Sequence, residues 1–314
     1  MTNENKMLSA APAWQPTREI ELIVGTPPGG GQDRPARTLM RALVSAKRVK
    51  VPMRLSNIAG KGGGNAWDAL RARAGDPHVL SISSLPLLSN RILGISDFDH
   101  AALTPLANLY SEYLAFIVPA NSAIRSAAQM YDLLKANPGA TPIALATAIG
   151  STNHIALGQL LSHAGADPRA LKLRVFDSAL YAVDDVVAGN AQVGVISAVS
   201  ARKALESGTA RVLAVSAPAR LGGVFAEAPT WTELAVPCII GQWRGVMGAP
   251  GIEAAHIEFW AQALAAAVES SEWKDDLAAN SWSADFMSGA KLRTFLDAER
   301  DFVDGMLRAL GLIG

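Results

Sequence analysis

The stretch Gly25-Thr26-Pro27-Pro28-Gly29-Gly30-Gly31-Gln32-Asp33 lies between an apolar run, residues 20–24, and an amphipathic run, residues 34–44. The prolines hold φ at about −65° and lack backbone donors, whereas the glycines accept positive φ and allow close approach to the main chain. A helix that starts after such a loop leaves unpaired N–H groups at the positive end of its dipole. The stretch therefore predicts an anion site, which we interpret as a carboxylate-binding loop.

The same stretch is also compatible with an ordinary strand-to-helix connection in which Asp33 caps the helix. It is not the phosphate loop of nucleoside triphosphatases, because no Gly-Lys-Ser or Gly-Lys-Thr follows it. It also lacks the G-x-G-x-x-G spacing of dinucleotide-binding folds. Neither nucleotide-binding motif is therefore indicated.

Composition narrows the class of protein. The chain has 314 residues, 50% of them apolar, and its formal net charge is +0, which suits one large or two medium α/β domains. No long basic run or aromatic-interleaved patch indicates nucleic acid as a partner. The single cysteine, Cys238, excludes an internal disulfide, and its apolar neighbours predict an inert core thiol. Because the histidines are scattered without metal-ligand spacing, we expect no metal and no cofactor.

The start of the chain, residues 1–17, is polar and contains alanine and proline. It predicts a flexible leader, without an apolar stretch long enough for an export signal. No run reaches the length needed to cross a bilayer, so direct membrane insertion is not expected. A trimmed mature form, a recloned start and a cytoplasmic protein are all compatible with this sequence.

Strand, loop and helix patterns alternate along the chain, which predicts mainly parallel sheets covered on both faces. Two segments, residues 119–122 and 239–247, are interpreted as crossings between two units. Lobe 1 is expected over residues 18–118 plus 245–314 and lobe 2 over residues 119–244, joined by a two-strand hinge. The expected strands are residues 20–24, 53–57, 79–83, 114–118, 143–146, 172–176, 193–197, 211–216 and 239–247. The expected helices are residues 34–44, 66–74, 127–136, 155–164, 179–188 and 201–206, with a helical tail from residue 252.

A second candidate loop, Thr147-Ala148-Ile149-Gly150-Ser151-Thr152-Asn153-His154, opens a helix in the second unit and mirrors the position of the first. Its donors would be the side chains of Ser151, Thr152 and Asn153 and the N–H groups of the incoming helix turn. His154 lies at the edge of this loop, where a helix-start histidine bonded to the backbone is the alternative.

Other candidate ligand contacts come from strand ends and from the hinge. Ser83 and Ser84 end a strand, where hydroxyls can face a ligand or serve as turn and cap residues. Trp243 and Arg244 lie near the predicted hinge, where Trp243 can wall the cleft or belong to the core. Arg34 is a further possible cation.

In this order, a set of short motifs resembles one family. The motifs are residues 20–24 followed by Pro27-Pro28-Gly29-Gly30 and Asp33; Asn57 with the loop 60–64; Gly75-Asp76; Ala136-Asn137-Pro138-Gly139; Gly150-Ser151-Thr152-Asn153-His154; residues 212–216; Ala228-Pro229-Thr230 with Glu233-Leu234; and Trp243 with Gly248-Ala249-Pro250. Singly these motifs are weak, but together they cover nearly the whole chain after the leader. The sequence resembles the periplasmic solute receptors of tripartite tricarboxylate transporters, also called Bug receptors.

The resemblance implies a two-lobe α/β fold like that of periplasmic binding proteins, each lobe a mainly parallel sheet flanked by helices. It implies a small carboxylate held between the lobes, largely by main-chain donors of the two loops and ordered waters. The candidate ligand-binding residues are Thr26, Pro28, Gly29, Gly30, Gly31, Gln32, Asp33, Ser83, Ser84, Gly150, Ser151, Thr152, Asn153, His154, Phe176, Asp177, Ser197, Trp243 and Arg244.

Several positions depart from the usual pattern of these receptors. Thr26 stands where an aromatic residue usually precedes the double proline, and Phe176-Asp177-Ser178 stands where Tyr-Lys-Gly is often found. Ser197 is the nearest polar substitute for a frequent acidic residue, and Arg244 is an unusual cation. These departures alter the expected pocket wall, so the resemblance does not transfer a particular substrate.

The leading hypothesis is a monomeric, non-enzymatic receptor that binds a small organic carboxylate in the periplasm and delivers it to membrane transporter subunits. One alternative is a cytoplasmic enzyme on the same scaffold in which His154 or Asp33 does acid/base work. Another is a ligand sensor that passes lobe closure to a partner protein. The absence of an export signal in the sequence favours the alternatives, whereas the lack of paired carboxylates, a nucleophile elbow or a metal set disfavours the enzyme.

Overall fold

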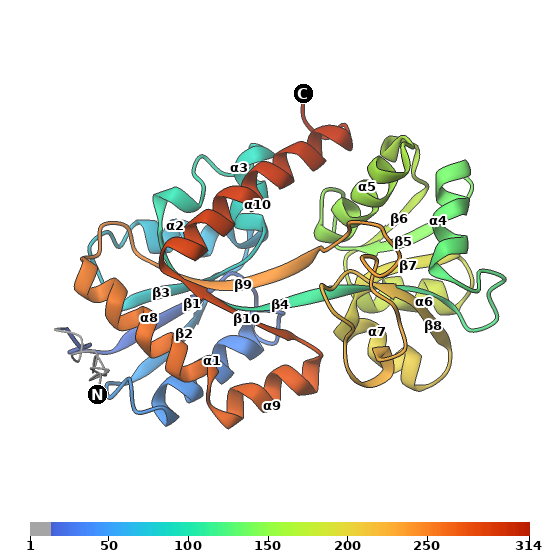
Figure 1. Cartoon of the computed structure of the whole chain (residues 1–314). Helices are drawn as coiled ribbons and strands as arrows, with labels where there is room; N and C mark the ends of the chain where they lie inside the picture. The colour runs from blue at the N-terminus through green and yellow to red at the C-terminus, as the bar shows by residue number, and fades with distance from the viewer. Residues whose placement is uncertain (1–13) are drawn as a thin grey trace, which may run out of the picture.

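The computed structural model describes residues 14–314. They form two α/β lobes side by side, joined by two long strands that run between them (Figure 1). The first is β4 (Thr104–Pro119), which pairs with β9 up to Tyr113 and with β7 and β8 from Leu114 onward. The second is β9 (Gly241–Gly248), which is antiparallel to β4. The lobe boundaries expected at residues 118 and 245 lie on these two strands.

Lobe 1 is built on the strand order β2-β1-β3-β9-β4, with β10 pairing on β4. Its first three strands are parallel, as consecutive strand–helix units require. The strands are β1 (Ile20–Val24), β2 (Met53–Asn57), β3 (Val79–Ser83) and β10 (Ser283–Ser288). The helices are α1 (Asp33–Ser45), α2 (Gly64–Arg71), α3 (Pro86–Ile92), α8 (Ala254–Val268), α9 (Ser271–Asn280) and α10 (Gly289–Ala309).

Lobe 2 continues the sheet as β4-β7-β5-β6, with β8 also pairing on β4. Its strands β5, β6 and β7 are parallel, and helices α5 and α6 connect them in the order β5-α5-β6-α6-β7 along the chain. The strands are β5 (Ile143–Ala146), β6 (Leu173–Phe176), β7 (Val193–Ser197) and β8 (Ala210–Val215). The helices are α4 (Ala127–Ala136), α5 (Thr152–Ala164), α6 (Ala179–Val187) and α7 (Ala198–Glu206).

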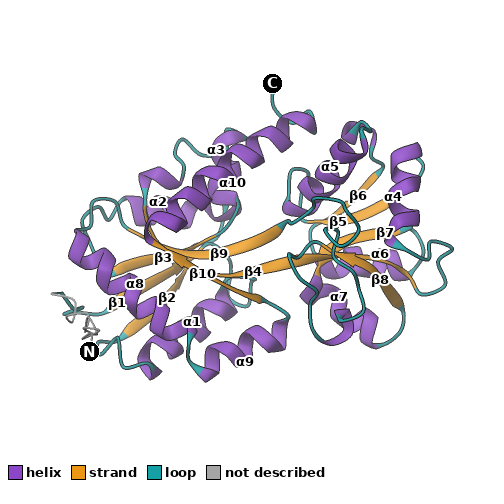
Figure 2. Cartoon of the chain, viewed as in Figure 1, coloured by secondary structure: helices purple, strands orange, loops and turns teal. Residues whose placement is uncertain are grey.

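Helices cover both faces of the sheet in each lobe (Figure 2). The central strands therefore have little contact with water: every residue of β1, β3 and β5 is buried. This agrees with their mainly apolar sequences, and the polar residues Glu21 and Ser81 within them have hydrogen-bond partners. The two-lobe α/β fold expected from the sequence is confirmed by this architecture.

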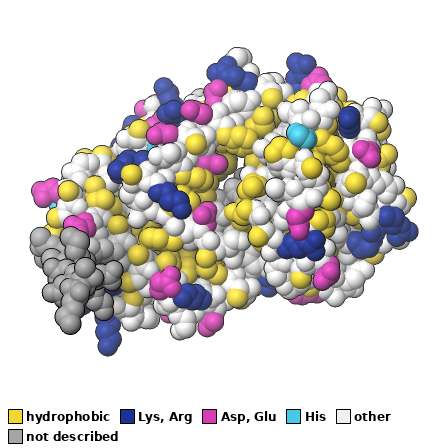
Figure 3. Space-filling view, viewed as in Figure 1, with side chains coloured by type: hydrophobic (Ala, Val, Ile, Leu, Met, Phe, Trp, Pro, Cys, Tyr) yellow, Lys and Arg dark blue, Asp and Glu magenta, His cyan; other side chains and the backbone are white. Residues whose placement is uncertain are grey.

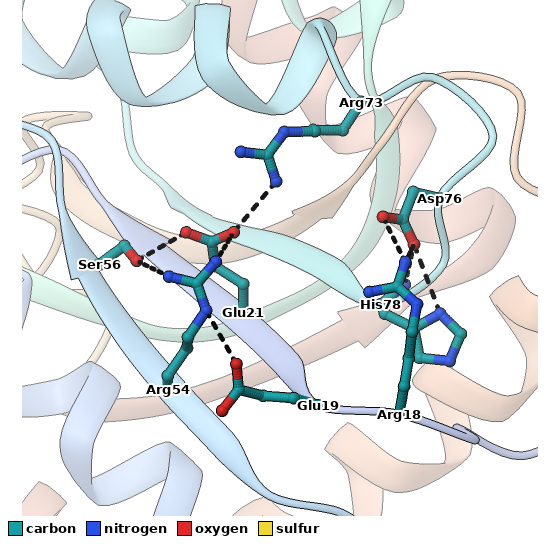
Figure 4. A network of polar contacts seen from close by, with 8 residues as sticks. All are labelled: Arg18, Glu19, Glu21, Arg54, Ser56, Arg73, Asp76 and His78. Carbon is teal, nitrogen blue, oxygen red and sulfur yellow. Dashed lines mark hydrogen bonds and ion pairs between the residues drawn. The ribbon is translucent and has the colours of Figure 1, made fainter.

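Lobe 1 also contains a network of charged side chains (Figure 4). The buried carboxylate of Glu21 on β1 accepts from Ser56 at 2.6 Å and pairs with Arg54 at 2.6 Å and Arg73 at 3.1 Å. Glu21 and Arg54 are register partners on β1 and β2. These contacts compensate the cost of burying Glu21 and pin the β1–β2 register.

Three elements differ from the sequence-based expectation. The tail expected to be helical from residue 252 contains a strand, β10, and β4 begins ten residues before the expected 114. Helix α3 was not expected. The length of β4 is set by strands distant in the sequence, because β9, β10, β7 and β8 all pair with it. Local pattern carries no information on such partners.

Most of the leader expected over residues 1–17 lies outside the described residues. Within residues 14–17, the Trp14 ring makes edge contacts with His78, His256 and Phe259, at centroid distances of 5.4, 4.7 and 5.2 Å. No helix within residues 14–314 is both long and apolar enough to cross a bilayer.

Candidate functional site

A cleft of about 330 Å³ lies between the lobes, at the carboxyl ends of β1, β3 and β5. Figure 3 shows the surface hollowed where the two lobes meet. Loops that follow parallel strands gather at this edge of each sheet, which is where open α/β sheets bind ligands. The lining residues are Gly25, Thr26, Gly31, Gln32, Gly62, Ser84, Leu85, Pro86, Ser89, Thr147, Gly150, Ser151, Thr152, Gln242 and Arg244.

The lobe 1 loop, residues 25–32, connects β1 to α1 through a tight turn. The N–H of Gly30 donates to Pro27 O at 2.9 Å, and Gly29 has a φ of 79°, as the third position of a type II turn requires. Positive φ was expected for the neighbouring glycines too, but among the three only Gly29 has it. The turn therefore uses the N–H of Gly30 for itself. In the described part of the chain, the N–H groups of Gly31 and Gln32, two residues that line the cleft, have no backbone partner, whereas that of Asp33 donates to Gly30 O at 3.0 Å.

Gln32 fixes the lobe 1 loop from inside. Its Oε1 accepts the N–H of Gly25 at 2.9 Å, and its Nε2 donates to Ser84 Oγ at 3.3 Å. The side chain thus ties both ends of the loop to the end of β3. Because these groups are buried, losing the glutamine leaves unpaired donors and acceptors.

Asp33, the first residue of α1, is turned to partners on its own lobe. Its carboxylate accepts from Arg37 Nε at 2.9 Å, Asn57 Nδ2 at 2.9 Å and Gly29 N–H at 3.1 Å. The Arg37 hydrogen bond, with those of Asn57 and Gly29, lowers the pKa of Asp33 to about 2 although burial opposes this. Asp33 is therefore an ionised brace, and it does not line the cleft.

The lobe 2 loop, residues 147–151, is fixed by its own helix. The N–H of Gly150 donates to His154 Nδ1 at 3.0 Å, and Ser151 Oγ donates to Ala146 O at 3.1 Å. Burial lowers the pKa of His154 to about 4, so the imidazole is neutral at pH 7 and its Nδ1 can accept. Asn153 donates to Val195 O and so ties α5 to β7.

The two loops bring two helix starts to one cleft. Gln32 is the N-cap of α1 and Thr152 is the first residue of α5, and both line the cleft. Neither helix has a side-chain hydrogen bond at its cap. The first-turn N–H groups of α5 and the positive ends of two dipoles are thus directed at the same space. On the α1 side the free donors among the described residues are the loop N–H groups of Gly31 and Gln32, because Asp33 N–H donates to Gly30 O and Pro35 has no N–H. This arrangement stabilises an anion.

The hinge strand β9 contributes the wall between the loops. Gln242 and Arg244 line the cleft, whereas Trp243 does not. Successive side chains on a strand point to opposite faces. Trp243 is buried and meets Phe295 of α10 edge-on at 6.2 Å, which places it in the core.

The cleft includes eight of the sequence-predicted residues: Thr26, Gly31, Gln32, Ser84, Gly150, Ser151, Thr152 and Arg244. Pro28, Gly29, Gly30, Asp33, Ser83, Asn153, His154, Phe176, Asp177, Ser197 and Trp243 are not part of its lining. Among these, Ser197 donates to Ser200 at 2.8 Å, and Asp177 is exposed. Arg34, the other candidate cation, pairs with Asp276 at 2.6 Å outside the cleft.

Gly25 and Thr147 belong to the two predicted loops but were not among the individual candidate residues, and Gly62, Leu85, Pro86, Ser89 and Gln242 were not predicted as ligand contacts. Two signals were available for some of them. Gly62 belongs to the second glycine loop, 60–64, and Gln242 lies two residues from Arg244 on a strand, hence on the same face. Within residues 14–314, no three or more His, Cys, Asp or Glu side chains are grouped so that they could hold a metal ion.

Two α/β lobes, connected by two strands and separated by a cleft with polar lining residues, are the architecture of a two-lobe solute-binding protein. The model of the tripartite tricarboxylate transporter family receptor matches residues 41–312, so the chain belongs to this receptor family. It is 27% identical over 305 residues to Protein BugT of Bordetella pertussis, covering 94% of this chain and 90% of BugT.

Solved structures share the fold. A TctC solute-binding protein from Polaromonas has a TM-score of 0.82 and 22% identity, covering 93% of this chain and 99% of that one. Rpa4515 of Rhodopseudomonas palustris, with adipate, has a TM-score of 0.75 and 19% identity, covering 94% and 98%. MatC of the same organism, with bound malate, has a TM-score of 0.71 and 18% identity, covering 94% and 99%.

Proposed function

We propose that this protein captures a small organic carboxylate in the cleft between its lobes and releases it unchanged to a tripartite tricarboxylate-type transporter. The observation that carries the proposal is the meeting of two helix starts, without side-chain caps, in one polar cleft. Carboxylates match this arrangement because each oxygen accepts several N–H or O–H donors.

The energetics are adequate for a receptor. Four or five charge-assisted hydrogen bonds contribute roughly 1.5 to 3 kcal/mol each. They offset the cost of ordering ligand and lobes and leave the ~8 kcal/mol that corresponds to micromolar affinity. A ligand held this way needs no resident cofactor.

The similar proteins support both the class of ligand and its delivery to a membrane transporter. The neighbouring structures with adipate and malate share the two-lobe fold. The family is that of transporter receptors, which supports a periplasmic location and delivery to membrane subunits. A single chain contains both halves of the cleft, which supports action as a monomer.

The rival function is an enzyme on the same scaffold, with His154 or Asp33 as the acid or base. The contacts of both residues favour a structural role: His154 Nδ1 accepts from Gly150, and Asp33 is bound by Arg37 and Asn57. A general acid or base must reach the proton that it transfers. Both residues lie behind the loops that they brace, which favours binding without conversion.

The test is native mass spectrometry of gently purified protein, followed by calorimetric titration with a panel of carboxylates. We expect one carboxylate per chain, recovered unchanged after long incubation. Recovery of a converted product would contradict the receptor function and support the enzyme. Binding of no carboxylate in the panel would remove the proposed ligand class.

A further inference from the structure

The hinge presents one polar face to the cleft side of the molecule. Tyr110 and Glu112 on β4 are the register partners of Arg244 and Gln242 on β9. Residues two apart on a strand, and direct cross-strand partners, share a face. These four side chains therefore form a polar cluster on the wall that both lobes share, and two of them, Gln242 and Arg244, line the cleft.

Arg244 has unused hydrogen-bonding capacity. It is nine-tenths buried, with 9% of its surface exposed. Its guanidinium donates to Gln242 Oε1 at 2.8 Å and to Trp243 O at 3.3 Å. A guanidinium carries five N–H donors, so these two bonds leave three. One of them, on Nε, is buried and has no partner in the described part of the chain.

Arg244 is also the only charged side chain among the described residues that line the cleft. Its nearest acid, Glu112, lies 3.6 Å away from Nη2, which is too long for a hydrogen bond. Glu112 therefore compensates the charge of Arg244 without occupying its remaining donors. Tyr110, on the same face, is packed against the rings of Trp273 and Trp282 and does not line the cleft, so Arg244 is the member of this cluster that a charged ligand group can reach. A buried cluster with unmet donors is suited to an acceptor brought in by a ligand.

We propose that Arg244 determines specificity by binding a second carboxylate of the ligand, so that this receptor selects short dicarboxylates over monocarboxylates. This inference rests on the proposed function, in which the helix starts of α1 and α5 hold the first carboxylate. A guanidinium fork matches a carboxylate in a bidentate arrangement, which neutral lining residues do not offer.

The size of the cleft agrees with a short diacid. Its volume of about 330 Å³ is close to the lower limit for ligand pockets and equals the liquid volume of about eleven waters. A small acid with one carboxylate at the helix starts and another at the hinge also contacts both lobes and the wall between them.

The experiment compares acids that differ only in the second carboxylate: butanedioate with butanoate, hexanedioate with hexanoate, and terephthalate with benzoate. Calorimetry should give at least tenfold tighter binding of the diacid in at least one pair. Arg244→Gln should remove most of that preference while changing affinity for the monoacid less than about threefold. Arg34→Gln, which removes an arginine paired outside the cleft, is the matched control and should leave the preference unchanged.

Glu112→Gln separates selection from a merely structural role. Removing the competing carboxylate should strengthen diacid binding and leave monoacid binding unchanged. If Arg244 only supports the β4–β9 pairing, Glu112→Gln and Arg244→Gln will weaken both acids of a pair alike. Because Arg244→Gln leaves Glu112 without its partner, the double variant Arg244→Gln/Glu112→Gln, checked by circular dichroism, keeps the test valid if the single variant unfolds.

The outcomes separate the two proposals. Equal affinity for both acids of every pair, or equal losses in Arg244→Gln, overturns the role of Arg244 and leaves the receptor function standing. Failure of the parent protein to bind any acid in the panel contradicts the receptor function itself, and the role of Arg244 with it.

Discussion

The loops of lobe 1 and lobe 2 take the same place in the fold but are held in different ways. Each connects a buried parallel strand to a helix of 13 residues. The lobe 1 loop is braced by Asp33 of its own helix, which accepts from Gly29 N–H at 3.1 Å, and in addition by a side chain of another element, Asn57, which donates to Thr26 O at 2.9 Å. The lobe 2 loop is braced by His154 of its own helix. Polar residues beside an anion site can thus orient the main chain that meets the ligand.

The two bracing residues also differ in charge. The brace of lobe 1, Asp33, must be ionised, and its pKa is lowered to about 2. The brace of lobe 2, His154, must be neutral, and its pKa is lowered to about 4. Acidification should therefore weaken the lobe 2 loop before the lobe 1 loop.

The largest effect is expected from Gly30→Val in the lobe 1 loop. A Cβ at this position would lie 2.7 Å from Thr26 Cβ and 2.9 Å from Pro27 O, so the turn must shift. We expect a loss of about 2 to 3 kcal/mol in the free energy of unfolding and no measurable carboxylate binding. Chemical denaturation and calorimetry measure the two effects.

Gly31→Ala is the matched control in the same loop, because an added Cβ there has no atom within 4 Å in the described chain. Its stability should stay within about 0.5 kcal/mol of the parent. Equal stability of both variants would show that space around Gly30 does not constrain the loop.

The next largest effect is a pH dependence of the free energy of unfolding, which we expect from the lobe 2 loop. Unfolded His154 titrates near 6.5 and folded His154 near 4, so the unfolded state binds more protons between these values and stability falls as the pH falls. The contribution should be roughly 2 to 3 kcal/mol between pH 7 and 4.5. His154→Ala should be less stable than the parent by about 1 to 3 kcal/mol at pH 7, but should lack this slope.

The titration of Glu299 changes stability with pH in the opposite direction, so its contribution must be removed from the measured pH dependence. Burial and the nearby charge of Asp285 raise its pKa to about 7, so its contribution to stability is lost as the pH rises through 7. The measurement is therefore the difference between parent and His154→Ala in denaturation at each pH. A difference that does not change between pH 7 and 4.5 would contradict the neutral-brace role of His154.

Local sequence was sufficient for much of the fold. Strands such as β2, β3 and β5 and helix α4 have the bounds expected from apolar pattern and turn residues. The apolar pattern did not predict strands that depend on a distant partner. Residues 283–288 lie between two helices, and they form a strand because they pair with β4. Short polar segments of this kind carry no periodicity of their own.

Prediction of the site was limited by side-chain direction. Residues of both glycine loops could be assigned to the cleft, but the side chain of His154 points back to its own loop and that of Trp243 to α10. Once 241–248 is known to be a strand, alternation puts Gln242 and Arg244 on one face and Trp243 on the other. The bounds of that strand come from its pairing with β3 and β4.

The smallest effect on stability is expected at Thr26, whose Oγ1 is buried without a partner in residues 14–314. Thr26→Phe should change the ranking of mono-, di- and aromatic carboxylates by narrowing the lobe 1 side of the cleft, with melting nearly unchanged. Thr232→Phe adds the same ring at an exposed threonine outside the cleft lining and serves as the control. An unchanged ranking in Thr26→Phe would place Thr26 outside the ligand contact.

The central claim is that one carboxylate bridges the two loops and stabilises the closed form. Small-angle scattering of the parent protein, with and without a carboxylate that calorimetry shows to bind, tests it directly. We predict a smaller radius of gyration with ligand in the parent and no change in Gly30→Val that remains folded by circular dichroism. Stoichiometric binding without compaction in the parent, or equal binding and compaction in Gly30→Val, would contradict the claim.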